Sequence, residues 1–264
     1  MTLCEAVILG ILQGLTEFLP VSSSGHLVLG QYLLGLEHNL TFDVAVHFGT
    51  LLAIIIALFP EVQKMLIGLL PGSNEEKRQG RHLLMMVIIG TIPAAVIGLL
   101  FSDAIERLFA SIYTTGIMLI VTGTLLYLAD KASARVNQPK SVGSRDALLI
   151  GCGQALAILP GLSRSGTTLS VGLWRGLSRS DGARFAFLLA IPTILGAAIL
   201  ELPEAISAAT IGIAPLVAGM ITAMVTGYLA IRLFLVVVKN RLVLFSYYTW
   251  LLGSATLILA FVRR

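Results

Sequence analysis

Apolar stretches long enough to cross a lipid bilayer recur along the whole of this sequence. A helical crossing takes about 20 apolar residues. The stretches that meet this length are Phe42 to Phe59, Leu83 to Phe101, Ile112 to Ala129, Ala183 to Glu201, Ile211 to Val237 and Val243 to Val262. The chain is 56% hydrophobic and only 12% charged, which excludes an ordinary soluble domain. The sequence therefore predicts an all-α polytopic membrane protein with six transmembrane helices.

Two further apolar segments are interrupted near their centres by proline, glycine and serine. Leu3 to Gly35 contains "LPVSSSGH", and Ala147 to Leu173 contains "LPGLSRSGT". The backbone N–H and C=O groups freed at such a break cannot face lipid, because lipid offers them no hydrogen-bond partner. We therefore expect each segment to form a re-entrant helix pair that is buried in protein or lines a wet cavity.

The two broken segments match one another at a shift of 141 residues. The shift superposes Gln13 on Gln154, Gly10 on Gly151, Leu15 on Leu156, Ser22 on Ser163, Ser24 on Ser165 and Gly25 on Gly166. Each half, about 1–130 and 142–264, has one broken segment followed by three spans. Because three is odd, the second half enters from the opposite side. The sequence thus predicts one integral membrane domain, residues 1–264, built as an inverted-topology repeat.

The distribution of charged residues among the loops predicts how the protein is oriented in the membrane. If both broken segments return to the side they entered from, twelve of the 18 Lys and Arg residues fall on one face. They lie in the loops near Lys64 to Arg81, Lys131 to Arg145, Arg175 to Arg179 and Lys239 to Arg241, whereas Arg107, Arg263 and Arg264 fall on the other. The positive-inside rule makes the rich face cytoplasmic and places both termini outside. These loops also account for the net charge of +4, so we expect no nucleic-acid partner.

The first broken segment carries an ionisable group at membrane depth. Gln13 and Glu17 are four residues apart and share one helix face. A carboxylate inside a bilayer is costly, and by default it indicates a functional site. A purely structural alternative is that Glu17 pairs with Arg164 or caps a helix end.

Both breaks are rich in residues that suit an anion site. Ser22, Ser23, Ser24 and Gly25 are good capping residues for a helix that begins there. The free backbone N–H groups and the dipole of a helix N-terminus bind phosphate. The second break supplies further candidates, namely Gly161, Ser163, Arg164, Ser165, Gly166 and Thr168. Capping alone explains some of the serines, but it gives no role to the arginine.

His26 is the candidate for the chemistry itself. It follows Ser23 by three residues and Glu17 by nine. A histidine near a hydroxyl and a carboxylate can act as a base, or it can attack phosphorus while the carboxylate holds its tautomer. Two assignments stay open: Ser23 attacks and His26 takes its proton, or His26 attacks directly. We favour direct participation of His26, and we interpret His47, on the next span, as structural.

The motifs "QGLTEFLPVSSSGH" (residues 13–26) and "PGLSRSGTT" (residues 160–168) resemble the two signatures of the bacitracin-resistance type undecaprenyl-pyrophosphate phosphatases. The resemblance implies hydrolysis of undecaprenyl pyrophosphate to the monophosphate, which recycles the lipid carrier of cell-wall synthesis and antagonises bacitracin. It also implies a divalent cation, Mg or Ca, and a site that opens to the outer face of the bacterial inner membrane. A homodimer is left open.

From this resemblance we form a hypothesis for the site. Arg164, the serines, Thr168 and the helix N-termini hold the pyrophosphate, and the cation lies at Glu17, helped by Gln13. The rival from another class is a secondary transporter or flippase of a lipid phosphate or other anion, since inverted repeats with broken helices are a transporter architecture. A transporter would have no use for a Ser, His and Glu set at one place.

Overall fold

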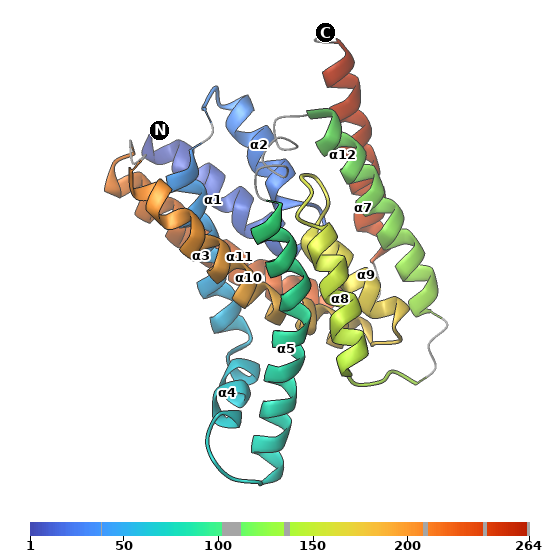
Figure 1. Ribbon diagram of the computed structural model, residues 1–264. Coiled ribbons are helices and arrows are strands. Elements are labelled where there is room, and N and C mark those ends of the chain that lie inside the picture. The colour runs from blue at the N-terminus through green and yellow to red at the C-terminus, as the bar shows by residue number, and fades with distance from the viewer. Residues whose placement is uncertain (38, 102–111, 135–137, 208–210, 240–241, 263–264) are drawn as a thin grey trace.

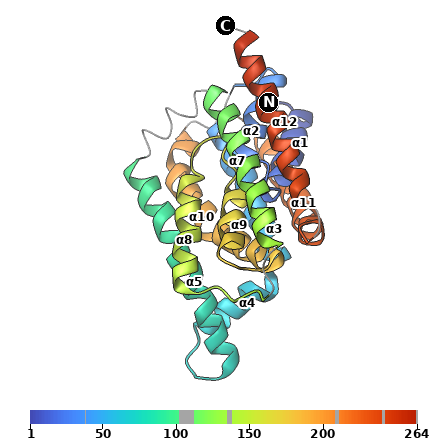
Figure 2. The same ribbon diagram turned by 90° about the vertical axis from the view of Figure 1, so that its right-hand side faces the viewer.

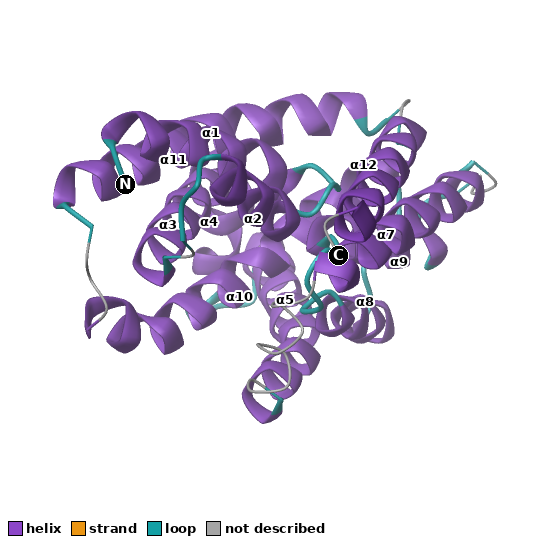
Figure 3. Cartoon of the chain, turned by 90° about the horizontal axis from the view of Figure 1, so that it is seen from above, coloured by secondary structure: helices purple, strands orange, loops and turns teal. Residues whose placement is uncertain are grey.

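The protein is helical throughout the part of the chain that its computed structural model describes, residues 1–37, 39–101, 112–134, 138–207, 211–239 and 242–262 (Figures 1 and 3). The described helices are α1 (Leu3–Phe18), α2 (Ser23–Leu33), α3 (Leu40–Ala57), α4 (Phe59–Gly68), α5 (Glu75–Leu100), α7 (Ile112–Ser133), α8 (Ser144–Leu156), α9 (Arg164–Trp174), α10 (Arg179–Ser207), α11 (Ile213–Val237) and α12 (Val243–Val262). Among the charges counted from the sequence, Arg107, Arg135, Arg241, Arg263 and Arg264 lie outside the described residues.

The six predicted transmembrane helices are confirmed. In the described chain, α3, α5, α7, α10, α11 and α12 are long and apolar enough to cross a membrane. Two of them begin a full turn or more earlier than predicted, α5 at Glu75 instead of Leu83 and α10 at Arg179 instead of Ala183. Their first turns are polar, so the apolar pattern marks only the part of each helix that follows. Helix α4 was not predicted, because the apolar run of α3 leads directly into it.

Each broken segment forms two helices joined by a turn, which is consistent with the predicted re-entrant pairs. α1 ends at Phe18, and Leu19 is extended (φ −71°, ψ 143°), the conformation that a residue before proline favours. α1 and α2 open toward the end of the molecule at which both N and C lie, whereas α8 and α9 open toward the opposite end (Figures 1 and 2). The two pairs thus run in opposite directions, which is the arrangement that an inverted repeat requires.

Two glycines that the repeat superposes occupy equivalent positions. α1 packs along α11, and α8 packs along α5. A Cβ added to Gly10 would lie 2.5 Å from the carbonyl oxygen of Gly219, and one added to Gly151 would lie 2.2 Å from that of Gly90. Only glycine permits such close backbone contact. This equivalence supports the predicted inverted-topology repeat.

The positively charged loops gather at the end toward which α8 and α9 open. Asp146, in the first turn of α8, pairs with Lys140 and with Arg175, in each case at 2.7 Å. Arg179 Nη1 donates to the carbonyl oxygen of Lys239 at 3.1 Å. Three of the predicted basic loops are therefore neighbours, and the α4 to α5 connection lies at the same end (Figure 1).

Aromatic packing fixes the end of α1. Phe18 is fully buried and meets Phe187 of α10 edge-on, with ring centroids 5.5 Å apart. Phe187 in turn contacts Phe234 of α11 at 5.8 Å. Large aromatic side chains contribute strongly to core packing. The residue that precedes the first break is thus held against two helices of the second half.

Candidate active site

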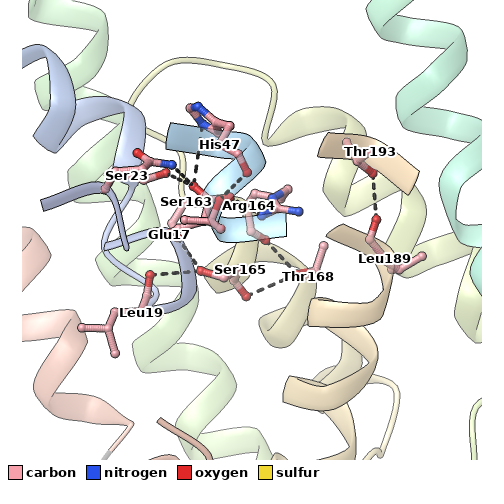
Figure 4. Close-up of polar contacts among 12 residues, drawn as sticks. Glu17, Leu19, Ser23, His47, Ser163, Arg164, Ser165, Thr168, Leu189 and Thr193 are labelled. Atoms are coloured by element: carbon pink, nitrogen blue, oxygen red, sulfur yellow. Dashed lines mark hydrogen bonds and ion pairs between the residues drawn. The ribbon is translucent and has the colours of Figure 1, made fainter. Parts of the chain in front are cut away.

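The two sequence motifs meet at the turns of the broken segments. Ser165 Oγ donates a hydrogen bond to the carbonyl oxygen of Leu19 at 3.1 Å. Arg164 donates from Nη2 to Glu17 Oε1, which joins α9 to α1 (Figure 4). Residues about 147 positions apart therefore share one site, at the place where the two halves of the repeat come together.

Glu17 is the centre of this site. Its side chain is only 5% exposed. Glu17 Oε2 accepts hydrogen bonds from Gln13 Nε2 at 3.0 Å and from Ser23 Oγ at 2.5 Å. The Gln13 contact follows from the predicted helix face, because residues four apart on α1 are neighbours. Paired with Arg164 and bonded by two neutral donors, the buried carboxylate is stabilised in its charged form.

The N-termini of α2 and α9 are capped in the same way. Ser22 Oγ accepts the N–H of Gly25 at 3.4 Å, and Ser163 Oγ accepts that of Gly166 at 3.1 Å. The hydroxyls of Ser22 and Ser24 lie 3.2 Å apart, as do those of Ser163 and Ser165. Both helix starts therefore lie at the site in related geometry, with dipoles that favour an anion.

Two predicted substrate-binding residues, Thr168 and Gly161, make contacts within the protein. The hydroxyl of Thr168 donates to the carbonyl oxygen of Arg164 at 2.7 Å, inside its own helix. Gly161 has a φ of +89°, and a Cβ there would lie 2.4 Å from the carbonyl oxygen of Thr115 on α7. Glycine is needed for this turn and for the close contact with α7. Neither residue offers the site a free polar side-chain group.

The predicted contact of His26 with Glu17 is wrong. His26 lies in the first turn of α2, with Nδ1 2.8 Å from the carbonyl oxygen of Ser22 and Nε2 2.6 Å from the hydroxyl of Tyr248 on α12. In the first turn of a helix a side chain points back toward the N-terminus, so the ring reaches the capping residue rather than α1. Ser23, not His26, is the α2 residue that bonds to Glu17.

The structure adds His47, which we had interpreted as structural. His47 lies on α3, and its Nε2 is 3.9 Å from Glu17 Oε2 (Figure 4). Its Nδ1 lies 2.8 Å from the carbonyl oxygen of Asp43, which orients the ring. The available signal was an ionisable residue inside a predicted span, which by default indicates function. Nothing in the spacing of the sequence linked it to α1.

The family described as bacitracin resistance protein BacA matches residues 6–255 of the chain. The protein belongs to the BacA family.

Curated relatives match this BacA-family protein over nearly its full length. The chain is 41% identical over 264 residues to the undecaprenyl-diphosphatase of Halothermothrix orenii, covering 98% of this chain and 99% of the relative. It is 46% identical to the undecaprenyl-diphosphatase of Carboxydothermus hydrogenoformans, covering 97% and 96%. The undecaprenyl-diphosphatase 3 of Bacillus cereus is 42% identical, with 98% of each chain covered.

Two polar atoms of the BacA-family site are buried without a protein partner in the described structure. They are Gln13 Oε1, an acceptor, and Arg164 Nη1, a donor. An unpaired buried polar atom is costly, and at a site it indicates a ligand that is bound there. The acceptor lies beside a carboxylate and suits a cation, whereas the donor suits a phosphate oxygen.

Proposed function

We propose that this protein hydrolyses undecaprenyl pyrophosphate to undecaprenyl phosphate and inorganic phosphate. The observation that carries the proposal is the Ser23 hydroxyl bonded at 2.5 Å to the buried carboxylate of Glu17, with a free donor of Arg164 beside it. A hydroxyl paired with a base is an activated nucleophile. The relatives named undecaprenyl-diphosphatase support this reaction.

Arg164 and the two helix starts would hold the pyrophosphate. Arg164 Nη2 is bound to Glu17, and Nη1 remains for a phosphate oxygen. Backbone N–H groups at the N-termini of α2 and α9 would bind further oxygens, since catalysis of phosphoryl transfer depends mainly on positioning and charge stabilisation. The hydroxyls of Ser24 and Ser165 each lie 3.2 Å from the capping hydroxyl of their helix.

Ser23 supplies the nucleophile in this mechanism. Its Oγ attacks the terminal phosphorus, its proton passes to Glu17 Oε2, and the bond from that phosphorus to the bridging oxygen breaks. Undecaprenyl phosphate leaves with the electron pair of that bond and takes up the proton. Water then attacks the phosphoserine and gives a proton to Glu17, which returns it to Ser23 Oγ as inorganic phosphate departs. In this mechanism His26 is not the nucleophile, and the contacts of its two ring nitrogens with Ser22 and Tyr248 support that choice.

A divalent cation, Mg or Ca, fits the oxygen donors of the site. Gln13 Oε1 and the Glu17 carboxylate would hold it, a set typical of hard cations that share their shell with phosphate. When bound, it would neutralise charge on the pyrophosphate. The described residues contain no cluster of three His, Cys, Asp or Glu side chains, and oxygens of the substrate or of water would share the coordination.

In this proposal the protein lies in the bacterial inner membrane with its site open to the outer side. The basic loops beside Asp146 and Arg179 support a cytoplasmic location for the end toward which α8 and α9 open. The end toward which α1 and α2 open is then external. The isoprenoid tail would lie between spans, where the exposed side chains are apolar.

A transporter or flippase would use the same repeat, but it would give no role to the bond between Ser23 and Glu17. Phosphate release from undecaprenyl pyrophosphate by the purified protein, with Mg²⁺ or Ca²⁺, separates the two functions. We expect Ser23→Ala to lower the rate by at least about 10³-fold, because the nucleophile is lost. Ser254→Ala, an exposed serine on α12, is the matched control and should retain the wild-type rate.

The acid stability of a trapped phosphoenzyme identifies the nucleophile. A phosphoenzyme trapped during turnover should be acid-stable and carry its phosphate on Ser23, whereas an acid-labile phosphoenzyme would assign the attack to His26. If the wild-type protein releases no phosphate while proteoliposomes still move the lipid phosphate, the proposed function is wrong.

A further inference from the structure

We propose that Tyr248 is a positioning residue of this site and that it acts through His26; the inference rests on the proposed function. Tyr248 lies on α12, in the second half of the repeat. Its hydroxyl is 2.6 Å from His26 Nε2. The two rings are stacked with an interplanar angle of 12° and centroids 5.7 Å apart. A residue 222 positions from His26 therefore determines the orientation of its ring.

The contacts select one form of His26. The carbonyl oxygen of Ser22 can only accept, so His26 Nδ1 must donate to it across their 2.8 Å contact. In the neutral ring, Nε2 is then an acceptor, and the Tyr248 hydroxyl donates to it. The partner of one ring nitrogen sets the role of the other. Loss of the tyrosine hydroxyl removes one of the two hydrogen bonds that orient the ring and so weakens its hold on the Ser22 carbonyl.

The carbonyl that His26 holds belongs to a strained residue. Ser22 has a φ of +69°, and it is the one non-glycine residue with positive φ in the described chain. Such a conformation is strained and persists only where neighbouring contacts enforce it. The Ser22 carbonyl accepts from both the ring and the backbone N–H of His26, the latter at 3.2 Å. That carbonyl belongs to the peptide unit that joins Ser22 to Ser23.

Tyr248 thereby controls where Ser23 points. The Tyr248 hydroxyl contacts the His26 ring, and this ring contacts the Ser22 carbonyl. The peptide unit of that carbonyl leads to Ser23, whose hydroxyl lies 2.5 Å from Glu17. A misplacement of a reacting group by about 1 Å can cost a factor of about 10² in rate. The second half of the repeat thus contributes Arg164 to the site directly and Tyr248 through a contact.

The neighbouring tyrosine provides a matched control. Tyr247 is exposed, and its ring contacts Trp250 at 5.9 Å. Tyr248→Phe removes one hydroxyl and keeps the ring stack on His26. Tyr247→Phe removes the same group from the adjacent position, which has no contact with the site among the described residues. Any general effect of removing a tyrosine hydroxyl from α12 will affect both variants.

The test measures kcat and KM for phosphate release from undecaprenyl pyrophosphate. We expect Tyr248→Phe to lower kcat about 10-fold, the worth of one hydrogen bond, with KM and Tm unchanged. Tyr247→Phe should match the wild type. In a His26→Ala background, Tyr248→Phe should change kcat no further, because two residues that act as one unit are not additive. His26→Gln provides a second background.

The outcomes are distinct for the two proposals. A wild-type kcat in Tyr248→Phe, or an equal 10-fold loss in both the wild-type and His26→Ala backgrounds, overturns the role of Tyr248 and leaves the phosphatase intact. No phosphate release by the wild type overturns the proposed function instead. Nitrogen-15 spectra of histidine-labelled protein test the contact without any turnover: the His26 Nε2 signal should shift in Tyr248→Phe and stay in place in Tyr247→Phe.

Discussion

At the scale of single residues, the site depends on what surrounds Glu17. Arg164 bonds to one carboxylate oxygen, whereas Gln13, Ser23 and His47 lie around the other. Breaking a buried ion pair leaves an uncompensated charge, so such a carboxylate and its arginine depend on one another. The sequence supplied the two members of this pair, but the presence of His47 follows from the packing of α3 against α1.

His47 is expected to restrain the carboxylate that faces Ser23. His47→Ala removes the imidazole 3.9 Å from Glu17 Oε2, and the carboxylate gains freedom to turn away from the serine hydroxyl. We expect kcat for phosphate release to fall about 10- to 100-fold with little change in KM.

The control for this prediction is His82→Ala. His82 lies on α5, and its Nε2 is 3.0 Å from the carbonyl oxygen of Val142. Equal kcat values for wild type and His47→Ala would return His47 to the structural role that the sequence suggested.

At the scale of helices, the first turn of α8 is tied down by charge. Asp146 accepts from Lys140 and from Arg175, and from the backbone N–H of Gly143 at 3.4 Å. Burial by itself would raise the pKa of Asp146, but these hydrogen bonds outweigh it and the pKa lies below its ordinary value. This cluster connects the start of α8 to the end of α9, so it fixes the second helix pair at its base.

The stability of the protein should therefore depend on pH through Asp146. Because the pKa is lowered on folding, the contribution is complete well above the ordinary aspartate pKa of about 3.9 and is lost as the pH falls below it. We expect the wild type to have a higher Tm than Asp146→Asn at pH 7, and the gap between them to close as the pH falls from about 5 to below 4. Thermal unfolding in detergent measures both.

The control is Glu76→Gln, which removes an exposed carboxylate from the first turn of α5. The Tm of this variant should equal that of the wild type at each pH. A Tm gap between wild type and Asp146→Asn that stays constant with pH would show that the cluster does not stabilise through its charge.

At the scale of the whole molecule, the two helix pairs open toward opposite ends, and the basic loops gather at one of them (Figure 1). The positive-inside rule then gives each end a side of the membrane. The connection from α2 to α3 should be external, and the connection from α4 to α5 should be cytoplasmic.

Single cysteines test this topology. Starting from Cys4→Ala and Cys152→Ala, which remove the exposed thiols, Glu37→Cys should react with a membrane-impermeant thiol reagent in intact cells. Ser73→Cys should react only after the cells are broken. Both positions are exposed, so access through the membrane is what differs between them. The reverse pattern would place the site on the cytoplasmic side.

The sequence by itself determined those features that depend on residues close together in the chain. The lengths of the apolar stretches predicted the transmembrane helices, and Pro20 and the serines predicted the break after α1. The spacing of four residues predicted that Gln13 lies beside Glu17. Periodicity and capping depend only on neighbours along the chain, so they can be read without a fold. The starts of α5 and α10 were missed because polar turns carry no apolar signal.

Only the tertiary structure decided which residues contact each catalytic candidate. His26 contacts Tyr248 rather than Glu17, and His47 lies next to Glu17. Such contacts depend on the rotation and depth at which helices pack, here set by close backbone approaches such as that of Gly10 to Gly219. No local pattern encodes these quantities, since they arise from the fit of side chains that are far apart in the chain.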